Sequence, residues 1–296
     1  MSTKRYARAM NELALPVKRR NSSGLRRDLE LLEALSTQEA VSAQGLGVVR
    51  LAEISNRDKG QVSRTLATLA EAGLVSRDPY TLAYRLGHQL YAMAARTAEA
   101  QLAHIAVPFL RRIVSATHET THLCVLRGGS VLTLSSELSE HAFRGLGWEG
   151  VSTSIWRTSA GRVLVSTWGN TELSRVFETN TNRALVTSPI PQIGSATRGD
   201  SVPASNLKVT NATSLVREIE LIRSQGYATV DEEFEIGVVG VSAPVYDFRG
   251  NLVAALNISA PKARLGGHLD EAGIFVARVA KDFSATLACS DKRTPA

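Results

Sequence analysis

Three residues with metal-binding or catalytic side chains, His118, Glu119 and His122, match the pattern H-E-x-x-H of zinc hydrolases. That chemistry needs both imidazoles on one face of a helix and the glutamate beside a metal-bound water. Here strand-like residues, 123–126, follow the motif directly. We therefore expect the histidines to lie on either side of a helix-to-strand turn, where they cannot share a metal. We predict no metal and no cofactor, and keep a zinc-dependent hydrolase as the alternative function.

A second short motif, Gly145–Gly150, matches the dinucleotide-binding pattern G-x-G-x-x-G. A dinucleotide site needs a strand before the glycines and a helix after them. The following residues, Val151–Trp156, have the composition of a strand, and Glu149 would repel a pyrophosphate. We interpret the glycines as part of a loop between strands.

The segment Thr158–Arg162 places small residues at a predicted helix start. Free backbone amides at such an end bind anions, so Ser159, Ala160 and Gly161 are candidates to hold the carboxylate of a small organic acid. The alternative is an ordinary helix capped by Thr158 or Ser159 with nothing bound. Because the sequence has neither a Gly-x-Ser-x-Gly elbow nor a persuasive Ser/His/Asp set, we do not predict an enzyme.

A third group of residues is suited to double-stranded DNA. A helix is predicted over 59–72, with Val62, Leu66 and Leu69 as its buried stripe. Its outward residues are Lys59, Gly60, Gln61, Ser63, Arg64 and Thr68. Arginine and lysine pair with guanine, glutamine pairs with adenine, and a glycine allows close approach to phosphate. A following hairpin offers Arg77, Tyr80 and Arg85 to the flanking DNA backbone. The alternative is a module of the same shape that binds protein.

The elements expected around this helix follow the order of a winged helix-turn-helix over residues 24–87. The first helix is capped by Ser22 or Ser23, runs to about Leu35 and carries an apolar stripe of Leu25, Leu29 and Leu32. A loop over 38–47, a short helix over 51–55 and a turn capped by Asp58 come next. Gly73 is expected to end the helix over 59–72, and strands over 74–77 and 83–86 then form the wing.

The rest of the chain predicts a second domain over 107–290, reached through a linker helix over 88–106. Strand candidates on both sides of Gly128-Gly129, a hairpin over 240–260 and interleaved helices favour an α/β domain with an antiparallel sheet. The fold class is thus α+β with two domains. The polar stretch 179–210 is too long for an ordinary connection and is predicted to be a mobile insertion.

Charge is unevenly distributed along the chain. The net charge is +6, and the first 27 residues hold eight lysines and arginines against Glu12 alone. Residues 1–23 are predicted to be a disordered basic arm that contacts nucleic acid or is simply a solvated tail. Two cysteines in 296 residues give no disulfide framework. No apolar stretch is long enough for a membrane span or a signal peptide, so we expect a cytoplasmic protein that does not bind membranes.

Together these residues resemble the IclR family of bacterial transcription regulators over about Leu25–Ala288. The resemblance rests on three stretches of the sequence. They are Leu51-Ala52-Glu53-Ile54 through Gly73-Leu74-Val75 with the wing residues up to Gly87; Thr158–Arg162; and Gly226-Tyr227-Ala228 with Asp231–Phe234, Val241–Asp247 and Ile258–Pro261.

The resemblance implies a GAF-like effector-binding domain, homodimers or dimers of dimers (homotetramers), and a repressor or activator of a catabolic or transport operon. It also implies an effector pocket lined by the turn Ser159–Gly161 and by strands holding Gly240, Asn257 and Ser259. The sequence departs from the family pattern at Val230, Gly240 and Asn257. The identity of the effector therefore cannot be carried over.

Overall fold

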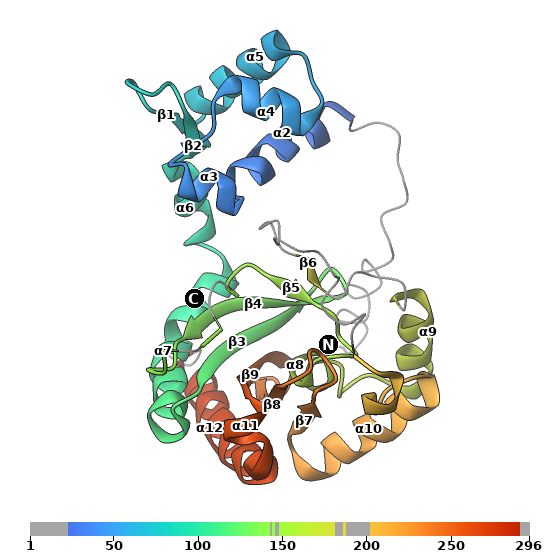
Figure 1. Cartoon of the computed structure of the whole chain (residues 1–296). Coiled ribbons are helices and arrows are strands. Elements are labelled where there is room, and N and C mark those ends of the chain that lie inside the picture. The colour runs from blue at the N-terminus through green and yellow to red at the C-terminus, as the bar shows by residue number, and fades with distance from the viewer. Residues whose placement is uncertain (1–22, 143, 146–147, 181–185, 188–201, 291–296) are drawn as a thin grey trace. The chain divides into compact units, whose positions relative to one another are not determined.

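The computed structural model describes residues 23–142, 144–145, 148–180, 186–187 and 202–290, and shows two compact units (Figure 1). Contacts divide the described chain between Gln101 and Leu102. The predicted basic arm, apart from its last residue, lies outside the described residues.

The N-terminal unit combines helices with a two-stranded antiparallel sheet. Its elements are α2 (Ser23–Leu35), α3 (Gln38–Ser42), α4 (Val48–Ser55), α5 (Lys59–Glu71), β1 (Val75–Arg77), β2 (Tyr84–Leu86) and α6 (His88–Ala94). Gly73 has a φ of +70°, as expected where a helix stops in the left-handed region. The prediction of a loop over 38–47 is wrong at its start, because Thr37 caps α3 by accepting a hydrogen bond from the Ala40 amide.

The core of this unit confirms Leu32 of the predicted apolar stripe of α2, which packs against the core, but not Leu25 and Leu29. Leu25 and Leu29 are 66% and 48% exposed, whereas Leu31 and Leu35 are buried against α4 and α5. This helix carries leucines on more than one face, so its periodicity alone does not choose the buried one. The packing partner, whose buried residues include Leu51, makes that choice.

The predicted linker helix over 88–106 is two helices. α6 ends at Ala94, and α7 covers Ala98–Thr117. The break is local, because the Thr97 hydroxyl accepts a hydrogen bond from the Ala100 amide and so starts a new helix.

The C-terminal unit is built on a seven-stranded antiparallel sheet in the order β6-β5-β4-β3-β9-β8-β7. Its strands are β3 (Thr120–Arg127), β4 (Ser130–Glu137), β5 (Ser152–Thr153), β6 (Val186–Thr187), β7 (Ala228–Asp231), β8 (Val238–Tyr246) and β9 (Leu252–Pro261). Gly128 and Gly129 both have positive φ, which matches the hairpin predicted between β3 and β4.

Helices cover both faces of this sheet (Figure 1). Besides α7 they are α8 (Ser159–Leu164), α9 (Asn170–Asn180), α10 (Ala212–Gln225), α11 (Lys262–Leu265) and α12 (Leu269–Ser290), with short 3₁₀ turns at Ala204–Asn206 and Gly266–His268. None of the helices in the described ranges combines the length and the apolar character that crossing a bilayer requires.

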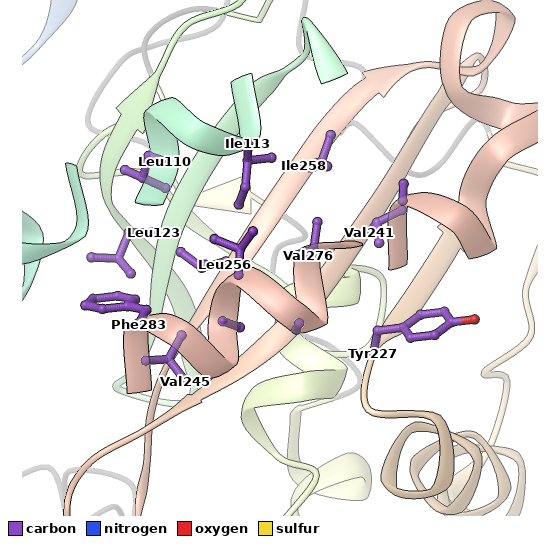
Figure 2. Close-up of a cluster of buried hydrophobic side chains, with 14 of the residues drawn as sticks. Leu110, Ile113, Leu123, Tyr227, Val241, Val245, Leu256, Ile258, Val276 and Phe283 are labelled. Carbon is purple, nitrogen blue, oxygen red and sulfur yellow. The ribbon is translucent and has the colours of Figure 1, made fainter. Parts of the chain in front are cut away.

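The two faces of the central strands differ in chemistry. One face presents Leu123, Val241, Leu256 and Ile258 to α7 and α12, where they form the main hydrophobic core (Figure 2). The residues between them point to the opposite face and include His122, Asn257 and Ser242. The hydrogen-bonding groups on this polar side of the sheet need partners where they are buried.

The predicted insertion 179–210 is not free along its whole length. α9 continues to Asn180, and at the other end Val202 and Val209 are buried in the C-terminal unit. The Lys208 amide donates a hydrogen bond to the buried carboxylate of Glu233. Residues 181–185 and 188–201 lie outside the described residues.

Candidate functional site

The outward face of α5 is open, as the periodicity predicts. Its six candidate residues are exposed: Lys59, Gly60, Gln61, Ser63, Arg64 and Thr68. On the inner face Val62 and Leu66 are fully buried, and Leu69 is half-buried. Asp58 caps the helix by accepting a hydrogen bond from the Gln61 amide at 3.0 Å. The exposed face therefore carries two cations and several small polar groups, while the opposite face of the helix packs in the core.

An ion pair and a hydrogen bond of Arg57 fix the orientation of α5 against α2. The Arg57 guanidinium lies 3.1 Å from the Asp28 carboxylate and donates a hydrogen bond to the Thr65 hydroxyl at 3.3 Å. Since Arg57 precedes the cap of α5, this contact holds the N-terminal end of the helix in place.

The three candidate residues of the β1–β2 hairpin are also exposed. Tyr80, at its tip, is 92% exposed. The guanidinium of Arg77 lies over the ring of Tyr84, 5.5 Å from its centroid, and Arg85 pairs with Asp78 at 2.8 Å. Asp78 also accepts hydrogen bonds from the Tyr80 and Thr81 amides, which shapes the turn. The two arginines are thus partly held within the hairpin.

The H-E-x-x-H motif spans a helix-to-strand turn, as predicted. α7 ends at Thr117, His118 has a left-handed φ of +57°, and β3 begins at Thr120. Glu119 forms a bidentate ion pair with Arg264, with N–O distances of 2.5 and 2.7 Å. His122 is buried in the sheet, with Nδ1 2.8 Å from the Ser136 hydroxyl. The geometry gives this set no shared metal position, and the described residues contain no group of three or more His, Cys, Asp or Glu that could hold a metal.

A cavity of about 600 Å³ lies on the polar side of the sheet in the C-terminal unit. Five of the six residues predicted for an effector pocket line it: Ser159, Ala160, Gly240, Asn257 and Ser259. α8 supplies the first two from its N-terminal end, where Thr158 Oγ1 accepts a hydrogen bond from the Gly161 amide. The amides of Ser159 and Ala160 come before that of Gly161 in the chain. They are among the first amides of the helix, which have no intrahelical acceptor.

Gly161, the sixth predicted residue, does not line the cavity. A Cβ at this position would lie 2.2 Å from the carbonyl oxygen of Ile155. The glycine is required because the backbone of α8 packs directly on the preceding loop, so its predicted role in ligand contact is corrected to one of packing.

We expect Gly161→Ala to lower the free energy of unfolding by about 1–3 kcal/mol, because the added methyl group forces α8 away from Ile155. Urea unfolding of the full chain measures this change. Gly169→Ala is the matched control, since a Cβ at Gly169 meets nothing within 4 Å. Equal stability of the two variants would contradict the packing role.

Several residues of the cavity wall were not predicted from the sequence to line a ligand site. They are His122, Cys124 and Thr133 on β3 and β4, Trp148 and Phe234 in loops, and Arg264 on α11. The rings of Trp148 and Phe234 lie edge to face, 6.1 Å between centroids. The alternation of β3 carried the missing signal, because every second residue from Thr120 to Cys124 faces the cavity.

A hydrogen-bond cluster joins α8 to the sheet beneath the cavity. The hydroxyls of Ser159 and Ser242 lie 2.8 Å apart. Asn257 Nδ2 donates to Ser242 Oγ at 2.9 Å and lies 3.2 Å from Ser159 Oγ. The helix end is therefore tied to two adjacent strands, β8 and β9.

Burial sets the protonation of two groups in the cavity wall. It lowers the pKa of His122 to about 4, so the imidazole is neutral at pH 7. It raises the pKa of the Cys124 thiol to about 12, which makes this cysteine an unreactive thiol. Both side chains act as neutral polar groups.

The lowered pKa of His122 predicts that acid destabilises the fold. Between pH 6.5 and about 4 the unfolded chain binds a proton that the folded chain excludes, so stability falls as the pH falls. The contribution is complete above pH 6.5, and its loss amounts to about 3 kcal/mol. Urea unfolding at pH 7.5, 6 and 5 should show a smaller loss for His122→Asn than for the wild type. Parallel pH curves for the two proteins would contradict a buried neutral imidazole.

Comparison with protein families finds two matching models. One, described as "Bacterial transcriptional regulator IclR C-terminal", matches residues 94–190 and 200–285. It skips 191–199, inside the predicted insertion. The other, HVO_A0114, matches residues 25–83.

Curated relatives that match most of the chain include two regulatory proteins. The HTH-type transcriptional regulator BhcR of Paracoccus denitrificans is 26% identical over 249 residues, which cover 83% of this chain and 81% of that protein. The Pca regulon regulatory protein of Pseudomonas putida is 26% identical over 242 residues, 75% of each protein.

Solved structures share the fold over nearly the whole chain. An IclR homolog from Microbacterium hydrocarbonoxydans complexed with 4-hydroxybenzoate has a TM-score of 0.71 at 20% identity, covering 90% of this chain and 99% of that one. The IclR protein of Thermotoga maritima has a TM-score of 0.66 at 23% identity, covering 89% and 98%. At these identities the likeness supports the two-unit architecture.

Proposed function

The chain belongs to the IclR family of bacterial transcriptional regulators. We therefore propose that it binds operator DNA and that a small-molecule effector raises or lowers its affinity for that DNA. The open face of α5 is the observation that carries this proposal. A zinc hydrolase has no support, since Glu119 is paired with Arg264 and the two histidines lie on either side of a turn.

In this proposal the N-terminal unit is a winged helix-turn-helix whose recognition helix is α5. Lys59, Gln61 and Arg64 read base edges in the major groove, and Ser63 and Thr68 add smaller polar contacts. Gly60 lets the backbone approach a phosphate. In the β1–β2 wing, Arg77, Tyr80 and Arg85 contact the flanking DNA backbone. The basic arm adds phosphate contacts in the same way.

The C-terminal unit is proposed to be a GAF-like effector domain with its ligand in the cavity. The amides of Ser159 and Ala160 suit a carboxylate. Gly240 lets Ser159 and Val230 pack close to β8, since a Cβ there would lie 3.2 Å from Ser159 Oγ and 3.1 Å from Val230 Cγ2. A small organic or aromatic acid is the proposed effector. It agrees in kind with the 4-hydroxybenzoate bound to the structural relative.

The proposed assembly is a homodimer or a dimer of dimers in the cytoplasm. Two recognition helices then read a near-palindromic operator with half-sites about one turn apart. An effector that prefers one arrangement of these helices shifts operator affinity by that preference.

The proposal is tested by selecting binding sites from a pool of random DNA duplexes with the purified full chain. We expect enrichment of a near-palindromic sequence and a steep fall in affinity as salt increases. Failure to enrich any sequence over several rounds would overturn sequence-specific DNA binding. A module that binds protein predicts that outcome.

A further inference from the structure

A row of polar side chains crosses the sheet at the floor of the cavity. His122 on β3, Asn257 on β9 and Ser242 on β8 lie directly opposite one another in the strand register. Asn257 is the central member of this row and lines the cavity. It is also one of the three positions, with Val230 and Gly240, where this sequence departs from the family pattern, so its contacts bear on what this particular chain binds.

The hydrogen bonds of Asn257 fix the orientation of its carboxamide. Besides the two serine hydroxyls, Nδ2 faces the main-chain carbonyl oxygens of Val241 at 3.3 Å and Ile258 at 3.2 Å. Carbonyl oxygens only accept hydrogen bonds, so the NH₂ group must be the one that faces them. The amide oxygen, Oδ1, is therefore turned the other way.

Oδ1 is left as an acceptor for a ligand. Within the described part of the chain it accepts no hydrogen bond, and it is not among the side-chain atoms enclosed without a partner. Since Asn257 is half-buried and lines the cavity, this oxygen opens into it. A ligand that fills the cavity without a donor at this point would desolvate Oδ1 and leave it unpaired.

The neighbouring serines supply a complementary donor. The 2.8 Å bond between Ser159 and Ser242 uses one hydroxyl proton, and either oxygen can donate it. When Ser242 donates, the proton of Ser159 can reach an acceptor placed directly against it at the cavity wall, where Ser159 is 1% exposed. The cluster then presents an acceptor and a donor side by side, a pattern that a hydroxyl group satisfies completely. A carboxylate oxygen placed against Oδ1 would instead be repelled.

We propose that Asn257 is a specificity-determining residue that selects ligands carrying a hydroxyl group, which donates to its Oδ1 and accepts from Ser159. This inference rests on the proposed function, because it takes the cavity to be the effector site. The ligand class is thus a hydroxylated small acid, with the hydroxyl on the sheet and the carboxylate elsewhere in the cavity.

Isothermal titration calorimetry on the full chain tests this with pairs of acids that differ only by a hydroxyl. The probes are 4-hydroxybenzoate with benzoate, 3-hydroxybutyrate with butyrate, and lactate with propionate. We expect the hydroxylated member of at least one pair to bind about tenfold more tightly than its partner. In Asn257→Leu that preference should fall to about twofold or less. Asn170→Leu, the same change at an exposed position at the start of α9 that does not line the cavity, should keep it.

The outcomes separate this inference from the function on which it rests. Equal binding of both members of every bound pair, or an unchanged preference in Asn257→Leu, overturns the role of Asn257 and leaves small-molecule sensing intact. No binding by any probe counts against the proposed effector function, and the inference falls with it. If Asn257→Leu does not fold, the wild-type comparison and the conservative Asn257→Ser variant still decide.

Discussion

Reversing the charge of Arg64 is expected to abolish specific operator binding while the fold remains intact. Arg64 is exposed on α5, outside the buried stripe formed by Val62 and Leu66. Loss of one base contact costs about 1–3 kcal/mol, so a dimer with two such helices loses about 2–6 kcal/mol. A glutamate at this position adds repulsion from phosphate. Fluorescence anisotropy with the duplex selected by the wild-type chain measures the change in Kd for Arg64→Glu.

The matched control for Arg64→Glu is Arg217→Glu. Arg217 is also an exposed helical arginine, but it lies on α10 in the other unit. It changes the net charge equally, so the difference between the two variants isolates position from overall charge. Equal affinities of the two variants for the selected duplex would show that α5 is not the recognition helix.

Removing the guanidinium of Arg162 is expected to be the most destabilising single change in the C-terminal unit. Its side chain is fully buried and pairs with Glu233, which is 1% exposed. The Arg162–Glu233 contact is bidentate, one of its N–O distances being 3.0 Å. Nη1 also lies 3.3 Å from Glu218, and Nε donates to the carbonyl of Trp156 at 2.9 Å. Arg162→Met leaves the buried carboxylate of Glu233 without its cationic partner, which costs about 3–5 kcal/mol.

Urea unfolding of the full chain, followed by tryptophan fluorescence, measures this loss. Arg112→Met is the control, because its ion pair with Asp282 has both side chains 49% exposed. That variant should lose less than about 1 kcal/mol. The double variant Arg162→Met, Glu233→Leu should recover much of the stability, because no charge remains buried. Similar losses for Arg162→Met and Arg112→Met would contradict this account.

The same ion pair has a consequence for the cavity. Glu233 precedes Phe234, which lines the cavity, and Arg162 lies on α8 together with Ser159 and Ala160. The pair therefore holds two walls of the cavity at a fixed separation. Variants that weaken it should reduce ligand affinity as well as stability.

Local patterns in the sequence were sufficient for the parts of this protein that depend on neighbouring residues. The period of Val62 and Leu66 predicted which face of α5 is buried, and Asp58 and Gly73 predicted where that helix begins and stops. The turn near His118, which excludes the zinc motif, followed from the strand-like residues 123–126 directly after the motif. These features are set by backbone geometry within one or two helical turns.

Other features depended on packing partners far away in the sequence. The buried face of α2 was predicted only in part because its leucines occupy more than one face, and only contact with α4 and α5 selects among them. Gly161 was assigned to ligand binding, whereas the approach of Ile155 explains why it is a glycine.

The sequence by itself determined the family, the order of α2, α4, α5 and the β1–β2 hairpin, and the exposed face of α5, since each rests on short-range periodicity or on motif residues. Only the tertiary structure decided how the cavity is built. Strand register brings His122, Asn257 and Ser242 into one row, although they lie as far as 135 residues apart in the chain. Hydrogen bonds then orient the amide of Asn257 and leave its oxygen open. Such an arrangement depends on the pairing of whole strands, which no local stretch of sequence specifies.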